Sequence, residues 1–339
     1  MNGSKRSWNR YWTLGSLAVI FAAAAAAMAI GRFTIAPKEL AAVLIPGSFP
    51  DVQVSGQVRT VISNIRFPRV VLALLSGAGL AAAGAAFQGL FANPLATPDT
   101  LGAANGASFG AVLGILLGLP AFGIQTLAMI TGVAAVFMAW SVAQVRGTIP
   151  PLMVILAGMV VSSLFSALVS LVKYAADPQD VLPSITYWLM GSMASTTRTT
   201  LIMGAPFILA GSLLLFLLRW KLNTMSLPED EAKSLGIPVK RIRSLVILGA
   251  AMVTAAVVSM CGQIGWIGLL IPHMVRMIFG NDNRSVVPAS MASGALFMLI
   301  IDTAARSVMA TEIPVSILTS LIGAPCFILL LRKTGGIRL

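Results

Sequence analysis

The sequence predicts an all-α protein that crosses a membrane about ten times. Of its 339 residues, 57% are hydrophobic and only 10% are charged, and the mean hydropathy is +0.91. Soluble domains are about one quarter charged. Apolar runs close to the length of a membrane-crossing helix recur along the whole chain, since a helix needs roughly 20 apolar residues to cross a hydrocarbon core of about 30 Å. Composition and run length together exclude an ordinary soluble fold.

Ten apolar runs qualify as membrane spans, and the eighth of them is short. The runs are Tyr11–Ile30, Val70–Phe91, Leu101–Leu119, Ala121–Val145, Leu152–Leu171, Leu201–Leu218, Leu245–Met260, Ile264–Phe279, Ser285–Ile301 and Ile313–Leu331. The first run follows a basic stretch, as the core of a signal peptide does, but it is longer than the usual 7–15 apolar residues of such a core. We therefore interpret residues 1–339 as one membrane domain with a retained first helix.

The basic residues predict an orientation and not a nucleic-acid partner. If ten spans alternate from a cytoplasmic N-terminus, fifteen of the 23 Lys and Arg residues fall on the cytoplasmic side. The eight on the outer side are Arg32, Lys38, Arg59, Arg66, Arg69, Lys173, Arg198 and Arg306. Such an excess of Lys and Arg in cytoplasmic loops is usual in helical membrane proteins. Both termini are therefore expected in the cytoplasm, with the chain embedded in membrane lipid.

Residues 65–118 form the hairpin around which the other spans are expected to be arranged. Arg66 and Arg69 stand at the start of an apolar run whose one notable polar side chain is Gln88. Two prolines four residues apart end this run near Asn93 and Leu95, because they forbid a continuous helix. The next run opens with glycines at every fourth position, namely Gly102, Gly106, Gly110, Gly114 and Gly118.

Each part of this hairpin has two interpretations. Glycines four apart share one helix face and let another helix backbone approach closely. The same smooth face can also form the wall of a transport pathway, and we name Gly102, Gly106 and Gly110 as candidate pathway residues. The arginines either mark the membrane boundary or present charge to a partner outside the membrane.

The inner segment Arg219–Arg243 differs from every other loop. A short helix is expected within residues 227–238, with acidic residues near its start and a glycine at its end. We expect Leu227, Ala232 and Leu235 to share one face. Such a helix can lie on lipid or enter a protein groove, and three consecutive acidic residues favour the protein groove. The candidate contact residues are Leu227, Glu229, Asp230, Ala232, Leu235 and Gly236.

Catalytic and metal-binding motifs are missing from the sequence. No Gly-x-x-x-x-Gly-Lys-Ser/Thr phosphate loop occurs, so the chain is not expected to hydrolyse ATP or to act as an enzyme. Cys261, Cys326 and the single histidine, His273, have no partners at metal-ligand spacing. The acidic residue nearest to the centre of a span is Asp302, and Arg306 one helical turn away is expected to pair with it. Because ion-coupled transport usually needs ionisable groups within the membrane, the energy for transport is expected from a separate subunit.

Irregular and interfacial segments are predicted between some of the spans. Residues 261–268 contain three glycines, which predicts an irregular backbone that is buried in protein or lines a cavity. On the outer side, a short surface helix is expected from Pro37. The aromatic pair Tyr187 and Trp188 predicts a second short helix at the membrane interface.

Together these motifs resemble the iron-siderophore, haem and cobalamin import permeases (FecCD-like), which are the membrane subunits of type II ABC importers. The first signature of that family is matched by residues 65–69, Gln88, residues 93–98, residues 101–102 and residues 105–107. Residues 232–236 resemble the family's cytoplasmic coupling segment. Further matches are Gly262–Leu269, Ile271–His273, Glu312–Pro314 and Gly323–Pro325. The resemblance covers nearly the whole chain, although Trp266 stands where the family more often has Phe.

The resemblance implies a homodimer of ten-helix subunits with the pathway on its twofold axis. It also implies a substrate-binding protein outside and two ATPase subunits inside, which bind ATP and Mg, so this chain itself is expected to hold no cofactor. In the family, outer arginines meet acidic side chains of the binding protein, and these map onto Arg66, Arg69 and Arg306. The inner gate maps onto Asn93, Leu95 and the turn near Thr148.

The sequence leaves the substrate open. An iron-siderophore is the first expectation, since smooth apolar pathway walls suit a large chelate carried with few specific contacts. Haem, cobalamin and oxyanions such as molybdate are the alternatives within the family. Outside it, the rival functions are an ion-coupled secondary transporter and a membrane scaffold or channel. The expected location is the inner or plasma membrane of the cell.

Overall fold

The computed structural model describes residues 2–45, 47, 49–144, 150–227 and 229–333. Every regular element in these ranges is a helix. The α-helices are α1 (Asn2–Ala29), α2 (Pro37–Leu44), α3 (Gly56–Thr60), α4 (Phe67–Leu90), α5 (Ala103–Leu116), α6 (Ala121–Ala143), α7 (Pro151–Ala175), α8 (Val181–Leu189), α9 (Arg198–Leu222), α10 (Glu229–Ser234), α11 (Val239–Cys261), α12 (Ile267–Phe279), α13 (Asn283–Ala305) and α14 (Val315–Lys333). A π-helical turn, η1 (Val61–Arg66), joins α3 to α4, and two short 3-10 turns are η2 (Pro98–Leu101) and η3 (Thr224–Ser226).

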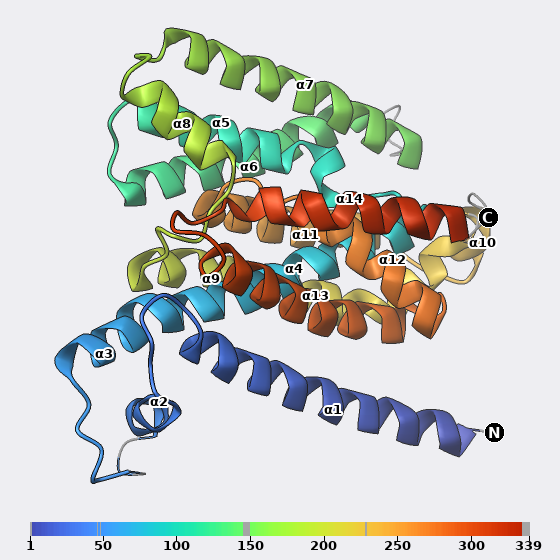
Figure 1. Ribbon diagram of the computed structural model, residues 1–339. Helices are drawn as coiled ribbons and strands as arrows, with labels where there is room; N and C mark the ends of the chain where they lie inside the picture. The colour runs from blue at the N-terminus through green and yellow to red at the C-terminus, as the bar shows by residue number, and fades with distance from the viewer. Residues whose placement is uncertain (1, 46, 48, 145–149, 228, 334–339) are drawn as a thin grey trace.

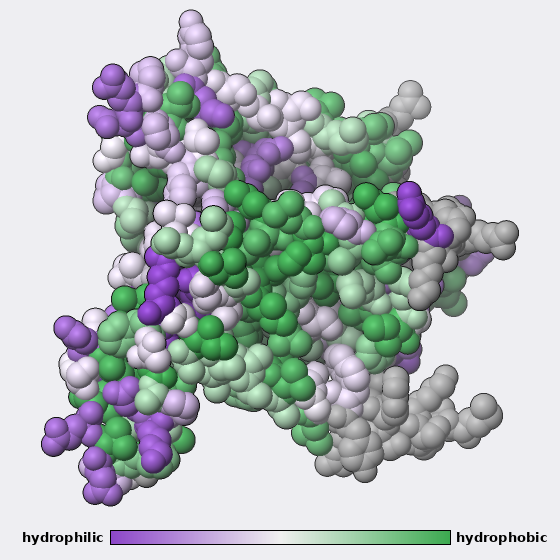
Figure 2. All heavy atoms as spheres, in the orientation of Figure 1, coloured by the Kyte–Doolittle hydropathy of each residue, from purple (hydrophilic) through white to green (hydrophobic). Residues whose placement is uncertain are grey.

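The ten expected spans correspond to ten of these helices in chain order, namely α1, α4, α5, α6, α7, α9, α11, α12, α13 and α14. Among the described residues, six helices are long and apolar enough to cross a membrane, and α1, α5, α12 and α14 carry shorter apolar segments. The start of α1 and the end of α14 lie at the same end of the bundle (Figure 1). Hydrophilic residues gather at the opposite end, beside α2 and α8, and an apolar band lies between the ends (Figure 2). The prediction of an all-α, multi-pass membrane fold is confirmed.

Helix α4 lies at the centre of the bundle and is buried along nearly its whole length. Its neighbours are α9, α11, α12 and α13. Small residues make this possible, because a helix without large side chains can be approached by other backbones. Gly77 faces Gly294 of α13, and Gly84 faces Gly268 of α12, so closely that a Cβ atom at Gly77 or Gly84 would overlap the opposite backbone.

The glycine face of α5 packs against α6. A Cβ atom at Gly106 would come within 2.7 Å of the carbonyl oxygen of Thr131, and one at Gly110 would overlap the Thr131 side chain. Helix α6 therefore covers the part of the glycine face that contains Gly106 and Gly110. Of the two interpretations of the glycine spacing, close helix packing applies to these two residues. Gly102 has a positive φ of 80° and begins α5, where it lies beside α7: a Cβ atom there would be 3.2 Å from Val161.

The break after α11 is irregular, as the three glycines predicted. Gly262 leaves α11 with φ +71° and ψ −167°, and α12 begins only at Ile267. The side chain of Gln263 donates hydrogen bonds to Asn105 at 3.2 Å and Ser108 at 2.9 Å, both on α5. Trp266, the residue before α12, has φ +72°, a region that bulky residues rarely adopt. Cys261, Gly262, Ile264 and Ile267 are buried and the other residues of the segment are partly buried, so protein covers much of this irregular backbone, as a membrane environment requires.

The expected short helices of the outer side are also present. Helix α2 begins at Pro37, and Glu39 accepts a hydrogen bond from the backbone nitrogen of Ala36 at 3.0 Å. Helix α8 carries Tyr187 and Trp188. Both helices lie at the hydrophilic end of the bundle (Figures 1 and 2).

Candidate functional site

The end of the bundle opposite the two termini, which the charge bias predicts to be the outer end, is held by an ionic cluster centred on the buried Arg69 of α4. Its Nε donates to Asp302 of α13 at 2.8 Å, and its Nη1 donates to Glu312 at 2.8 Å. Arg306 lies 3.6 Å from the second oxygen of Asp302, an ion pair without hydrogen-bond geometry. The predicted pairing of Asp302 with Arg306 is confirmed. The bonds of Arg69 join groups more than 230 residues apart in the chain, and sequence spacing could not reveal them.

Hydrogen bonds from two arginines, Arg66 and Arg306, connect the end of α1 to this region. Arg66 donates to the carbonyl oxygens of Met28 at 2.6 Å and Ala29 at 2.9 Å, and Arg306 donates to that of Ile30 at 2.7 Å. Arg66 ends the π-helical turn that leads into α4, and π-helical turns often occur at functional sites. A side chain at Gly31 would lie 2.6 Å from Arg66 Nη2, so this corner is closely packed.

Arg66, Arg69 and Arg306 are all buried in the single chain. Their guanidinium groups serve carbonyl and carboxylate oxygens of their own subunit, which is the usual condition for charge inside a membrane protein. They shape the outer surface and do not project from it. Exposed cations at the same end include Arg59 and Arg198. Docking of a binding protein through the three buried arginines stays a prediction.

The break between α4 and α5 is a compact loop at the opposite end of α4. Ala92 has φ +46°, and Asn93 accepts a hydrogen bond from the backbone nitrogen of Leu95 at 2.9 Å. Leu95 is exposed. The expected gate residues Asn93 and Leu95 thus lie in one turn, while Thr148 lies outside the described residues.

A polar network links this loop, the predicted gate loop, to the C-terminal end of α9. Arg276 of α12 donates to the side chain of Gln88 at 3.2 Å, to the carbonyl oxygen of Ala85 at 2.9 Å and to the side chain of Asn283 at 2.9 Å. The backbone nitrogen of Asn283 donates to the Asn223 side chain at 2.8 Å. Gln88 also accepts, through its backbone oxygen, from the nitrogen of Asn93 at 3.2 Å. Sequence analysis singled out Gln88 but missed its partners.

The three apolar residues expected to share a face at α10 differ in position and exposure: Ala232 lies in the helix, Leu227 precedes it and Leu235 follows it. Ala232 is 1% exposed, whereas Leu227 is 39% and Leu235 is 68% exposed. The expectation that the three share one face is wrong, because Ala232 packs inside its own chain. The predicted glycine stop is confirmed: Gly236 has φ +73°, and its nitrogen donates to Lys233 at 2.9 Å. The surface of this segment therefore offers two exposed leucines among acidic residues.

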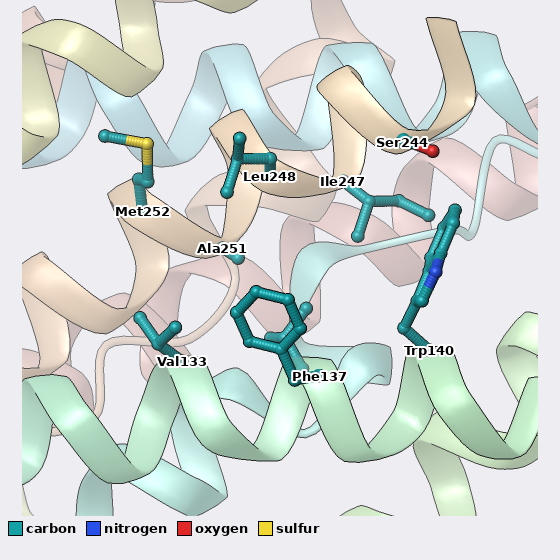
Figure 3. A pocket seen from close by; sticks show the side chains of 9 residues that line it. Val133, Phe137, Trp140, Ser244, Ile247, Leu248, Ala251 and Met252 are labelled. Carbon is teal, nitrogen blue, oxygen red and sulfur yellow. The ribbon is translucent and has the colours of Figure 1, made fainter. Parts of the chain in front are cut away.

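An apolar pocket of about 220 Å³ lies between α6 and α11. Figure 3 shows Phe137 and Trp140 of α6 facing Ile247, Leu248 and Met252 of α11 across it. Its one polar lining residue is Ser244, so it has nothing with which to bind a charged substrate. Within the described ranges, no group of three or more His, Cys, Asp and Glu side chains could hold a metal ion.

The outer ionic cluster predicts a strong effect of removing one partner. Arg69→Met leaves Asp302 buried with only the longer Arg306 contact, and breaking a buried pair in this way costs about 3–5 kcal/mol. The variant should therefore unfold at a clearly lower temperature in detergent. The double variant Arg69→Met, Asp302→Leu should recover part of the loss, because it removes the fully buried carboxylate and leaves only Glu312, whose side chain is 29% exposed, without its arginine. Arg59→Met, which alters an exposed residue at the same end of the bundle, is the control, and an equal loss in it would contradict the prediction.

Comparisons with known proteins agree along nearly the entire chain. The profile of the FecCD transport family matches residues 17–333. The molybdate import permease MolB of Haemophilus influenzae is 39% identical over 90% of this chain and 90% of its own length. The cobalamin import permease BtuC of Halobacterium salinarum is 37% identical over 81% of this chain and 74% of its own. The haemin permease HmuU of Yersinia pestis is 35% identical over 80% of this chain and 82% of its own.

Solved structures give the same result for the fold. An inward-facing structure of a metal-chelate type ABC transporter superposes with a TM-score of 0.84 at 38% identity, over 94% of this chain and 98% of that one. The buried arginines at one end of α4 and the broken loop at the other are thus set in the architecture of an ABC permease. The chain belongs to the FecCD transport family, whose members include import permeases for metal chelates.

Proposed function

We propose that this ABC importer permease moves an iron-siderophore or a related large metal chelate into the cytoplasm as a homodimer driven by separate ATPase subunits. The observation that carries the substrate class is the likeness, at a TM-score of 0.84 and 38% identity, to a metal-chelate type transporter. Two Helicobacter pylori relatives named as iron chelatin permeases, each 36% identical, support iron. Haem and cobalamin are the alternatives of the same chemical class.

Molybdate is a second candidate on one specific ground. The molybdate permease of Haemophilus influenzae matches this chain at 39% identity over 90% of both lengths. A small oxyanion and a large chelate place opposite demands on a pathway. The apolar pocket between α6 and α11 favours neither, because it is lined almost wholly by hydrocarbon.

A second copy of the chain is needed to build the pathway that we propose. Exposed apolar residues occur along α7 and α14, among them Leu156, Leu164, Leu321 and Leu329. Pairing of these faces would set two gate loops opposite one another and bring Leu95 of each copy toward a common axis. The inner and outer ends follow from the charge bias of the sequence, with both termini in the cytoplasm.

The inner surface supports docking of an ATPase subunit at α10. Two exposed leucines beside acidic residues form an apolar anchor with a charged rim, which is the composition of an energetic centre in a protein interface. Ala232 supports this surface from within. The outer surface supports docking of a binding protein, for which the buried Arg66, Arg69 and Arg306 would fix the shape and exposed residues such as Arg59 would supply charge.

The function is tested by reconstituting the permease with its ATPase subunits and binding protein in lipid vesicles. Uptake of labelled ferric siderophore should require ATP and should not respond to an ionophore that collapses ion gradients. Haem, cobalamin and molybdate form the comparison panel. Uptake that an ionophore abolishes while ATP is present would establish a secondary transporter, and uptake of molybdate alone would replace the chelate by the oxyanion.

The α10 surface gives a more local prediction. Leu235→Glu should weaken binding of the ATPase subunit about thirtyfold, since an interface anchor contributes about 2 kcal/mol. Leu235→Met keeps the apolar surface and is the matched control. Binding is measured with the purified subunits, and thermal unfolding of each variant shows that the fold is intact. Parental affinity of Leu235→Glu would place the ATPase contact elsewhere.

The Arg276 network predicts loss of coupling without loss of ATP hydrolysis. It joins Asn223, which directly precedes η3, to Gln88, which lies in the last turn of α4 before the gate loop. Arg276→Gln should lower the substrate transported per ATP by roughly two- to thirtyfold, which corresponds to about 0.5–2 kcal/mol of lost coupling.

Arg241→Gln, a change at an exposed residue of α11, is the control for that experiment. The ratio of uptake to hydrolysis is the quantity that matters, because a variant that merely misfolds loses both activities together. An unchanged ratio in Arg276→Gln would show that the network is only structural.

A further inference from the structure

Helix α1 leaves an apolar groove between itself and the rest of the bundle. The groove has a volume of about 490 Å³ and is lined by side chains of α1, α4, α9, α12 and α13. Trp12, Leu17 and Ile20 of α1 form one wall, and Leu74 and Leu75 of α4 form the floor. A second groove of about 350 Å³ lies along α1 and α13 and shares part of this lining. Helix α1 therefore stands partly away from the bundle.

Hydrocarbon is the material that can fill this space. The lining is largely apolar, and apolar cavities hold no ordered water because they offer it too few hydrogen-bond partners. The groove lies between helices that cross the membrane, so acyl chains have access to it from the side. An acyl chain in the groove would make dispersion contacts with the lining side chains, which an empty groove would lack.

One end of the groove carries charge. Arg284 lines it at the start of α13, and the Arg284 side chain is 52% exposed. Its guanidinium carbon lies 4.3 Å from the ring centroid of Trp220 on α9. Arg219, whose guanidinium carbon lies 3.7 Å over Phe216, stands on the same turn of α9 as Trp220. Phe216 itself lines the groove.

The same end holds one carboxylate that opposes this charge. Asp282 lies 3.9 Å from Arg284 Nε. Its Oδ1 also accepts from Asn223 at 2.7 Å and from the backbone nitrogen of Arg284 at 3.0 Å. Those two hydrogen bonds give the Asp282 carboxylate other partners. Its ion pair with Arg284 is long, at 3.9 Å, and exposed, so it contributes little to stability. Arginine matches phosphate in geometry and in charge.

We propose that the groove is a binding site for an anionic phospholipid, with an acyl chain between α1 and α4 and the headgroup phosphate at Arg284. Basic residues at the cytoplasmic ends of membrane helices commonly bind anionic headgroups. Trp220 holds the guanidinium at the interface through its ring face. The bound lipid joins α1 to the bundle where the protein's own packing is incomplete.

The binding is tested on the full chain purified in detergent. Phosphatidylglycerol should raise the temperature of unfolding in a saturable way, because a ligand that binds only the folded state stabilises it. Phosphatidylcholine with the same acyl chains should give a smaller effect. Arg284→Gln should weaken the apparent affinity for phosphatidylglycerol about tenfold, the loss expected for one charge-assisted contact.

Three further variants make the test specific. Asp282→Asn keeps an acceptor oxygen for Asn223 and removes the opposing charge, so it should strengthen phosphatidylglycerol binding. Ala292→Leu adds bulk to a groove-lining position and should weaken the binding of both lipids. Arg332→Gln changes an exposed arginine on α14, away from the groove, and should behave as the parent does.

Native mass spectrometry gives a second readout, in which the parent should retain phosphatidylglycerol and Arg284→Gln should not. Equal stabilisation by the two lipids would overturn the assignment of the headgroup to Arg284. Equal affinity of the parent and Ala292→Leu for both lipids would place the acyl chain outside the groove. Neither outcome depends on transport, so failure here is distinguishable from failure of the proposed function.

Discussion

The close approach of helices to α4 is the constraint on which the rest of the structure depends. Gly77 meets Gly294, and Gly84 meets Gly268, without room for a Cβ atom. Interiors packed at this density transmit displacement and do not absorb it. Helix α4 is therefore a rigid element that carries Arg69 at its outer end and Gln88 at its inner end. Each of these residues organises a polar cluster from helices that are distant in sequence.

The two polar clusters differ in what they join. The outer one ties α4 to α13, to Glu312 and, through Arg66 and Arg306, to the end of α1. Its three arginines and Asp302 are buried and its carboxylates are paired with arginine, which suits a surface of fixed shape for a partner. The inner one ties α4 to α12 and to the turn before α13, and it reaches the end of α9 just before the coupling segment. It links the element that we propose contacts the ATPase to the loop that we propose forms the gate.

The sequence predicted correctly those features that depend on residues close together in the chain. Run length predicted the ten helices, and the spacing of Asp302 and Arg306 predicted their pairing, because residues four apart share a helix face. The prediction was incomplete for features that depend on packing between helices distant in sequence. The glycine spacing of α5 allowed both packing and a pathway wall, and only the position of α6 distinguishes them. Likewise, Ala232 turns inward while Leu235 remains exposed, since the orientation of α10 is set by its contacts with α11 and not by its own pattern.

If α4 is rigid, a conformational change must occur at the irregular segments that connect the helices around it. The gate loop follows α4 directly and contains Ala92 at φ +46°, and Trp266 at φ +72° precedes α12. Non-glycine residues in this region each store about 1–3 kcal/mol of strain and persist only where their surroundings enforce it. Gly323 and Phe327 of α14 pack against Trp266 and hold it in this conformation. Helix α14 is one of the helices whose exposed face we propose for pairing with a second copy. The two strained joints thus adjoin α4 and α12, the helices that the Arg276 network connects.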